Sequence, residues 1–210
     1  MIESWIDIPN LKTVDLPKSF QEVQSKSITG IDMNMNEWID VSPILANLVP
    51  FTVSDIESIE SNVTSVHLPD WTCNDSDYSI FDFSRFILLR ELIIGNNCFS
   101  NVDIFRIDGL NHLKCIKIGI NSFTQQKDNW TTIKINPSRS FSISNCIELE
   151  SIEIGRYSFS DYGGLFELKN LPKLSTIKIG EIRSYSFNFY SSSFVIKGII
   201  DMILIMNRSS

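Results

Sequence analysis

The sequence has few of the residues that build metal or redox sites, and it has no long apolar run. Among its 210 residues are two histidines and four cysteines, and the cysteines lie far apart, at Cys73, Cys98, Cys115 and Cys146. No Cys-x-x-Cys pair or other zinc-ligand spacing occurs, so we expect reduced thiols, no metal and no cofactor. No uncharged apolar stretch approaches the roughly 18 residues of a transmembrane helix, so we expect no membrane insertion.

Basic side chains are scarce in the first part of the chain. Residues 1–80 carry 13 acidic and 3 basic side chains, residues 81–210 carry 12 and 15, and the formal net charge is −7. An acidic total opposes binding to nucleic acid and to anionic lipid, so we expect neither as a partner. The acidic part either attracts a basic partner or forms solvated loops. The first residues lack the basic and apolar regions of a signal peptide, which predicts a cytoplasmic location.

Catalytic motifs are missing as well. Neither His67 nor His112 belongs to a nucleophile motif, and no glycine-rich phosphate loop or pair of metal-binding histidines occurs. We therefore expect that the protein is not an enzyme.

A repeat of about 24–26 residues dominates the sequence, and it is clearest over a stretch of fifteen positions. Phe105–Gly119 reads F-R-I-D-G-L-N-H-L-K-C-I-K-I-G, and its apolar positions recur in register at Phe81–Gly95, Phe141–Gly155 and Phe166–Gly180. Isoleucine occurs 32 times against 16 leucines, and β-branched residues favour strands. The last part, L-x-x-I-x-I-G, alternates like a strand with one buried side. Such short strands must stack in parallel to bury their apolar sides, which predicts a β-rich solenoid.

The repeat is predicted to organise the whole chain as one domain. Its leucine position falls at Leu89, Leu113, Leu149 and Leu174, with looser matches at Leu11, Val63 and Met202. The predicted repeats are residues 1–31, 51–80, 81–104, 105–140, 141–165 and 166–193, with a degenerate repeat or helix at 32–50, an insertion at 124–140 and a partial repeat at 194–210.

The segment Leu113–Phe123, L-K-C-I-K-I-G-I-N-S-F, resembles the leucine-rich-repeat signature L-x-x-L-x-L-x-x-N-x-L, and its ending resembles the BspA-like class. The resemblance implies a right-handed solenoid with a curved parallel sheet on a concave face and mostly loops or short strands on the convex face. It also implies a buried ladder of asparagines at Asn97 and Asn121, which Tyr157 and Ile182 would interrupt. We further expect Phe99, Phe123 and Phe159 to stack inside the solenoid.

The resemblance implies that the concave face binds a partner protein. The side chains expected on this face form columns across the sheet, and the candidate binding residues are Asp15, His67, Glu91, Ile93, Cys115, Lys117, Ser151, Glu153, Thr176 and Lys178. A glycine column, Gly95, Gly119, Gly155 and Gly180, borders them. Alternatively, Lys117, Glu153 and Lys178 only pair with one another across adjacent strands.

The insertion at 124–140 is a second candidate site. It carries Lys127, Trp130, Lys134 and Arg139 with one acidic residue, a composition typical of interaction hot spots on loops. The alternative is a surface hairpin with Trp130 folded back onto the solenoid. The aromatic run Tyr185, Phe187, Phe189 and Tyr190 is expected to be repeat core.

The sequence therefore predicts a protein-protein interaction scaffold. The alternative is a structural, self-associating or surface-antigen-like repeat protein without a dedicated ligand. Neither end of the sequence has an evident polar cap, which suggests a fragment of a longer repeat protein, an amphipathic cap or self-association through the ends.

Overall fold

A computed structural model describes residues 56, 57, 59, 61–125, 134–181, 185–199 and 203–206. In these residues almost all regular structure is strand, and the strands form two parallel sheets. The six-stranded sheet contains β1 (Ser65–Leu68), β3 (Glu91–Ile94), β5 (Cys115–Ile118), β7 (Ser151–Ile154), β9 (Thr176–Ile179) and β11 (Ile203–Met206). The five-stranded sheet contains β2 (Ile80–Asp82), β4 (Ile104–Asp108), β6 (Ser140–Ser144), β8 (Leu165–Lys169) and β10 (Ser193–Lys197).

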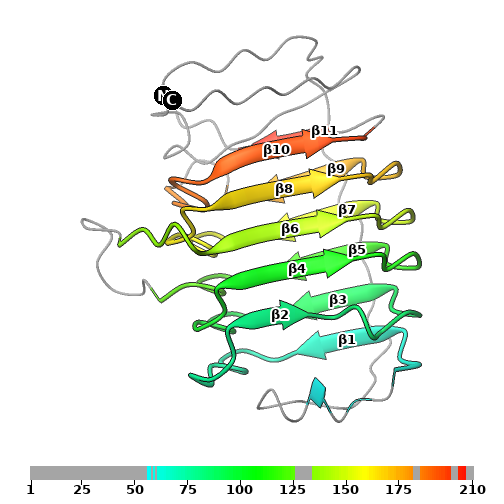
Figure 1. Cartoon of the computed structure of the whole chain (residues 1–210), viewed down its shortest axis with the longest axis horizontal. Helices are drawn as coiled ribbons and strands as arrows, with labels where there is room; N and C mark the ends of the chain where they lie inside the picture. The colour runs from blue at the N-terminus through cyan, green and yellow to red at the C-terminus, as the bar shows by residue number, and fades with distance from the viewer. Residues whose placement is uncertain are drawn as a thin grey trace.

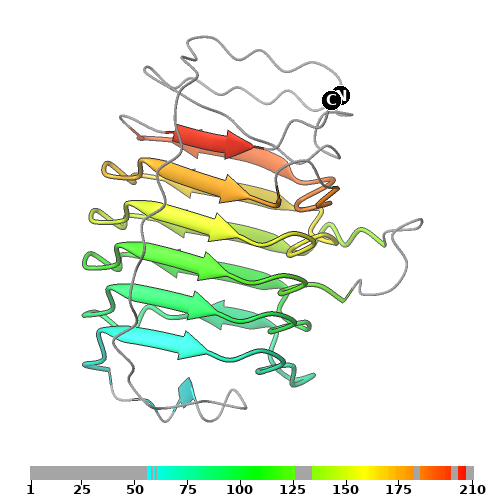
Figure 2. The ribbon, with the colours of Figure 1, turned by 180° about the vertical axis from the view of Figure 1, so that it is seen from behind.

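The chain alternates between the two sheets, so that each turn contributes one strand to each. Figure 1 shows the five-stranded sheet in front, and Figure 2 shows the six-stranded sheet from the opposite side. Each strand pairs in parallel with the corresponding strand of the next turn. The predicted β-solenoid of stacked parallel strands is therefore confirmed. The second sheet is more regular than the loops and short strands that the family resemblance implies.

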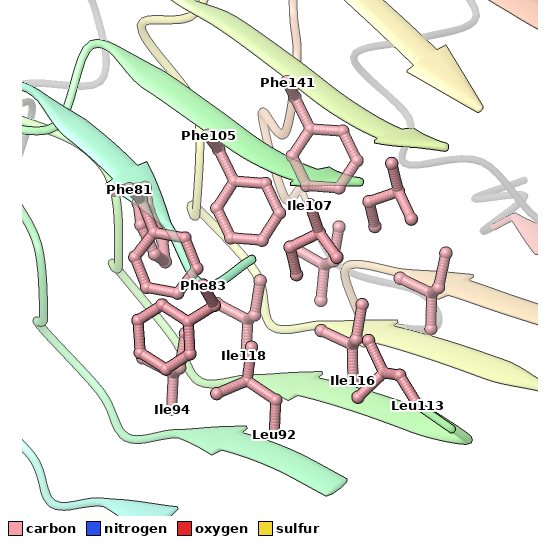
Figure 3. Close-up of a cluster of buried hydrophobic side chains, with 14 of the residues drawn as sticks. Phe81, Phe83, Leu92, Ile94, Phe105, Ile107, Leu113, Ile116, Ile118 and Phe141 are labelled. Atoms are coloured by element: carbon pink, nitrogen blue, oxygen red, sulfur yellow. The ribbon is translucent and has the colours of Figure 1, made fainter. Parts of the chain in front are cut away.

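The core lies between the sheets and contains the inward residues of strands β1–β10 together with buried turn residues such as Phe99 and Leu113. In β5, Ile116 and Ile118 are buried while Cys115 and Lys117 face outward, as the alternation predicts. Figure 3 shows how aliphatic side chains of the first sheet meet aromatic side chains of the second, with Ile118 and Leu92 on one side and Phe81, Phe105 and Phe141 on the other. This burial supplies the main favourable contribution to folding.

Two columns of phenylalanines run along the solenoid axis. The expected stack is confirmed: Phe123 lies parallel to Phe99 at 5.0 Å and to Phe159 at 4.7 Å between ring centroids. The second column is formed by the first inward residue of each strand in the five-stranded sheet. In this column Phe105 stacks on Phe81 at 4.8 Å and on Phe141 at 4.7 Å. The two columns meet edge to face, which is a favourable aromatic geometry.

The asparagine ladder implied by the family resemblance is wrong. Asn97 and Asn121 are turn residues with left-handed backbones, at φ 57° and 56°, and Tyr157 takes the same conformation at φ 65°. Asparagine tolerates this region better than other side chains because its short amide can bond locally. No hydrogen bond links the side chains of Asn97 and Asn121, and Asn121 Oδ1 is buried without a hydrogen-bond partner, so these amides do not form a ladder.

Small polar side chains one residue later form hydrogen bonds to the buried backbone groups of these turns. They form what we call the hydroxyl ladder: Thr72, Cys98, Ser122 and Ser158. Ser122 Oγ accepts from the Cys98 amide at 3.1 Å and donates to the Gly95 carbonyl at 2.8 Å. Ser158 Oγ does the same for the Ser122 amide, at 3.0 Å, and the Gly119 carbonyl, at 2.6 Å. Buried backbone groups of successive turns are thus paired by one side chain each.

The last strand is one residue out of the predicted register. With Met202 at the leucine position, Ile205 would correspond to Ile177, but β11 pairs Leu204 with Ile177 and Ile205 with Lys178. Spacing alone cannot fix this register because the final repeat is apolar throughout.

The repeats predicted at 1–31 and 32–50 lie outside the described residues. Within the described part of the chain, no helix has the length and apolar character that a bilayer crossing requires.

Candidate functional site

The outward side chains of β1, β3, β5, β7 and β9 form the surface that we call the strand face. Its predicted columns are confirmed in register. One column runs through Ser65, Glu91, Cys115, Ser151 and Thr176, and the next through His67, Ile93, Lys117, Glu153 and Lys178. Parallel neighbours are about 4.8 Å apart, so each column is a continuous row of side chains. Asp15, which we expected to extend this row, lies outside the described residues.

Glu91 is the best-connected side chain of the strand face. Its Oε2 accepts from the Ser65 hydroxyl at 3.1 Å and lies 3.0 Å from His67 Nε2, while its Oε1 accepts from the Cys115 thiol at 3.6 Å. The Glu91 side chain is only 13% exposed. The first three strands of this sheet are therefore joined across their outer surface by one carboxylate.

The Cys115 thiol is not poised as a nucleophile. Burial, and then the negative charge of Glu91, raise the pKa of Cys115 to about 12. Burial also raises the pKa of Cys146 to about 11 and that of Cys98 above its ordinary value. Only the thiolate is reactive, so these three cysteines are present as unreactive neutral thiols near pH 7. None of the four cysteines forms a disulfide.

Lys117 and Glu153 are neighbouring charges of opposite sign in the central column. Their side chains are 63% and 39% exposed, and Lys117 Nζ lies 3.9 Å from Glu153 Oε2. That distance is at the limit for an ion pair, and exposed pairs contribute at most about 1 kcal/mol. Glu153 is also the register partner of Lys178. Cross-strand pairing is thus present but too weak to account for the fold.

The glycine column lies where successive turns of the solenoid approach one another closely. A Cβ on Gly119 would lie 2.6 Å from the Asn96 side chain and from the Gly95 backbone, and one on Gly155 would lie 2.6 Å from Gly119. Successive turns therefore approach so closely here that only glycine fits. On the outer side, Asp70 accepts from the Asn96 amide at 2.7 Å, which lowers the pKa of Asp70.

The structure corrects the assignment of Arg139 to a surface loop site. Its side chain is 1% exposed and forms ion pairs with Asp161 and Asp103. Sequence composition cannot show this, because the two aspartates belong to the neighbouring turns and come into contact only when the repeats stack. Lys134 is exposed, whereas Lys127 and Trp130 lie outside the described residues. Arg139 is therefore an interior side chain that joins neighbouring turns and is not available to a partner.

The aromatic run near residue 187 is only partly core. Phe189 is buried, while Tyr185 is 47% exposed and Phe187 and Tyr190 are partly exposed. Phe187 stacks with Tyr157 at 6.2 Å and with Tyr185 at 5.8 Å, so these rings form a small cluster on the outside of the turns. The prediction of repeat core holds for Phe189 alone.

Across the described ranges, no group of three or more histidine, cysteine, aspartate or glutamate side chains could hold a metal ion.

Comparisons of the chain with family models, curated proteins and solved structures give no match.

Proposed function

We propose that this protein is a protein-interaction scaffold that binds a partner through the strand face of a leucine-rich-repeat-like solenoid. The two outward columns form a surface on which a partner can lie across several turns. In this proposal the contact residues are His67, Glu91, Ile93, Cys115, Lys117, Ser151, Glu153, Thr176 and Lys178.

The observation that supports this proposal most directly is the exposure of Lys117. Its side chain is 63% exposed, and its contact with Glu153 is at 3.9 Å. The fold gains little from a charge held in this way. Charged side chains in the middle of a sheet surface, with little structural benefit, are suited to partner recognition.

The test is affinity purification from native cells with the intact chain, the Lys117→Glu/Lys178→Glu variant and a matched control. The control is Lys169→Glu/Lys197→Glu, which reverses two neighbouring lysines on the five-stranded sheet. We expect a partner that is retained by the intact chain and the control but lost by the strand-face variant, while circular dichroism is unchanged in all three. Equal retention by both variants contradicts the proposal.

A second candidate function is self-association as a structural repeat protein. Ile80 and Ile104 are register partners at the outer surface of the five-stranded sheet and are 49% and 38% exposed. Sedimentation of the purified chain tests this candidate. A concentration-dependent oligomer that Ile104→Lys dissolves would support self-association, and a monomer at all concentrations would exclude it.

A further inference from the structure

The outer face of the five-stranded sheet, which is turned toward the viewer in Figure 1, carries an ordered pattern of side chains. Its middle strand, β6, presents only small outward side chains: Ser140, Ser142 and Ser144. The strands on either side each present one apolar and two charged side chains, namely Ile104, Arg106 and Asp108 on β4 and Leu165, Glu167 and Lys169 on β8. The basic residue precedes the acidic one on β4 and follows it on β8.

The charges of this face have few partners within the chain. Arg106 Nη2 lies 3.4 Å from Asp108 Oδ2, and the two side chains are 58% and 35% exposed. In the described part of the chain, Glu167, Lys169 and Lys197 form no ion pair within 4.0 Å. Lys169 and Lys197 are register partners, and like charges directly opposite one another destabilise a sheet. Negative charges from another molecule would therefore stabilise the two lysines.

The face as a whole is electrically neutral. Its outward strand residues include three acidic and three basic side chains: Asp82, Asp108, Glu167, Arg106, Lys169 and Lys197. The whole chain has a formal net charge of −7, so most of its surface repels a second copy. On this face two copies meet without a net repulsion, and their affinity depends on which charges lie opposite one another.

A second copy of the chain matches this face when it is turned by 180° about an axis along β6. The rotation keeps the position of each residue along the strands and exchanges β4 with β8 and β2 with β10. It therefore brings together three complementary pairs, each formed twice: Arg106 with Glu167, Asp108 with Lys169, and Ile104 with Leu165. The small side chains of β6 lie on the axis and let the strands on either side approach their counterparts.

The outermost strands are compatible with the same arrangement. Asp82 of β2 lies opposite Val195 of β10, one outward position, or about 7 Å, from Lys197. The long side chain of Lys197 can reach across that distance. Two sheets that pack face to face keep their strand directions within about 30° of one another, which an axis along β6 allows.

The alternative two-fold axis, along the solenoid, gives a poor match. It would keep each strand opposite its own copy, so that Arg106 faces Arg106 and Glu167 faces Glu167. It would also place Ile104 opposite Asp108. Like charges and an apolar side chain against a carboxylate both oppose this arrangement, so the pattern of the face distinguishes between the two axes.

We propose that this protein forms a symmetric dimer through the outer face of the five-stranded sheet, with the two-fold axis along β6. This inference makes the self-association candidate specific, and it is independent of the strand face, which lies on the opposite side of the solenoid (Figure 2). The face is about 19 Å wide across its five strands and about 17 Å long. That footprint is below the roughly 800 Å² per partner of a stable interface, so the dimer is transient and depends on concentration.

The test is sedimentation velocity of the full chain at low salt, from about 10 µM to about 1 mM, a range that covers weak interfaces. We expect a dimer fraction that rises with concentration. Arg106→Glu and Glu167→Arg should each weaken association at least about tenfold, because each places like charges opposite one another twice. An equimolar mixture of the two variants should dimerise like the intact chain, since every reversed side chain then faces an opposite charge.

The sign of the Glu167→Arg result separates this interface from a general charge effect. The substitution adds two units to the net charge and changes it from −7 to −5. Lower net repulsion alone would strengthen self-association, whereas the proposed interface predicts that it weakens. Ser142→Lys is a second variant that places two lysines on the axis, and it should sediment as a monomer. Urea unfolding checks that each variant is folded.

Three results would overturn the proposal: an intact chain that stays monomeric up to about 1 mM, folded single variants that dimerise like the intact chain, or a mixture of folded variants that stays monomeric. The two pairs of lysine variants separate this proposal from the proposed function. Lys169→Glu/Lys197→Glu should lose the dimer and retain a strand-face partner. Lys117→Glu/Lys178→Glu should retain the dimer and lose that partner, so either proposal can fail while the other stands.

Discussion

Arg139 Nη1 donates to Asp161 Oδ2 at 2.5 Å, in an interior where the two side chains are 1% and 6% exposed. The same guanidinium donates to Asp103 at 3.0 Å and to the Ser100 and Val102 carbonyls at 2.6 and 2.8 Å. These partners belong to the turns before and after that of Arg139. One side chain therefore joins three successive turns next to the insertion.

Arg139→Met is expected to destabilise the protein by about 3–5 kcal/mol. The substitution keeps an apolar side chain of similar length but leaves the buried Asp161 carboxylate without its counter-ion, and an uncompensated buried charge is costly. Urea unfolding followed by circular dichroism measures the change. A loss below about 1 kcal/mol would show that this ion pair is not important for stability.

The double variant Arg139→Met/Asp161→Leu separates the buried charge from the packing. Replacing both ions by apolar groups is often nearly neutral, so we expect the double variant to be more stable than Arg139→Met alone. If the second substitution instead adds a further loss, other hydrogen bonds of Asp161, such as the one it accepts from the Gln125 amide of the preceding turn at 3.1 Å, outweigh the charge effect.

Ser122→Ala is expected to cost about 1–3 kcal/mol. The substitution leaves the buried Cys98 amide and the Gly95 carbonyl without their partner in the hydroxyl ladder, and unpaired buried polar groups carry that cost. Ser142→Ala, on the outer surface of β6, is the control and should change stability by less than about 0.5 kcal/mol. Comparable losses for the two variants would contradict the role of the ladder. Chemical denaturation of both proteins decides between these outcomes.

Alternation and repeat spacing predict the solenoid, the columns of the strand face and the stack of Phe99, Phe123 and Phe159. These features depend on period alone, because a strand places every second residue on one side. The positions of Arg139 and Ser122 could not be predicted in this way. Arg139 depends on contacts between turns, and the hydroxyl ladder is displaced by one residue from the position that the family resemblance implies. A recurring Ser-Phe pair at Ser122 and Ser158 was the available signal for it.

Gly109→Asn is expected to leave stability unchanged within about 0.5 kcal/mol. Gly109 has φ 73°, and Asn145 and Asn170, which occupy the same position after β6 and β8, have φ 55° and 53°. A Cβ at Gly109 would meet nothing within 4 Å, so only backbone conformation limits this position. Asparagine tolerates the left-handed region, whereas a β-branched residue does not.

Gly109→Val is the matched comparison, and it should cost at least about 1–2 kcal/mol because valine is strained at positive φ. Thermal unfolding of the two variants beside the intact chain gives both values. If asparagine and valine destabilise equally, the position is limited by space or by solvent contacts and not by φ.

Cys115 is expected to react with iodoacetamide about a thousandfold more slowly at pH 8 than a thiol of the unfolded chain. The thiolate is the reactive form, and burial together with Glu91 raises the pKa of Cys115 to about 12. Raising the pH toward 12 should therefore accelerate the reaction while the protein remains folded. Peptide mass mapping after timed quenching reports the rate for this cysteine separately from Cys73, Cys98 and Cys146.

Two substitutions are expected to change the alkylation rate of Cys115 in opposite directions. Glu91→Gln removes a negative charge that disfavours the thiolate, so it should lower the pKa of Cys115 and increase the alkylation rate at pH 8. Lys117→Gln removes a positive charge that favours the thiolate, so it should decrease the rate. If both variants accelerate the reaction, they act by opening the strand face to the reagent, and the charge of Glu91 does not control this thiol.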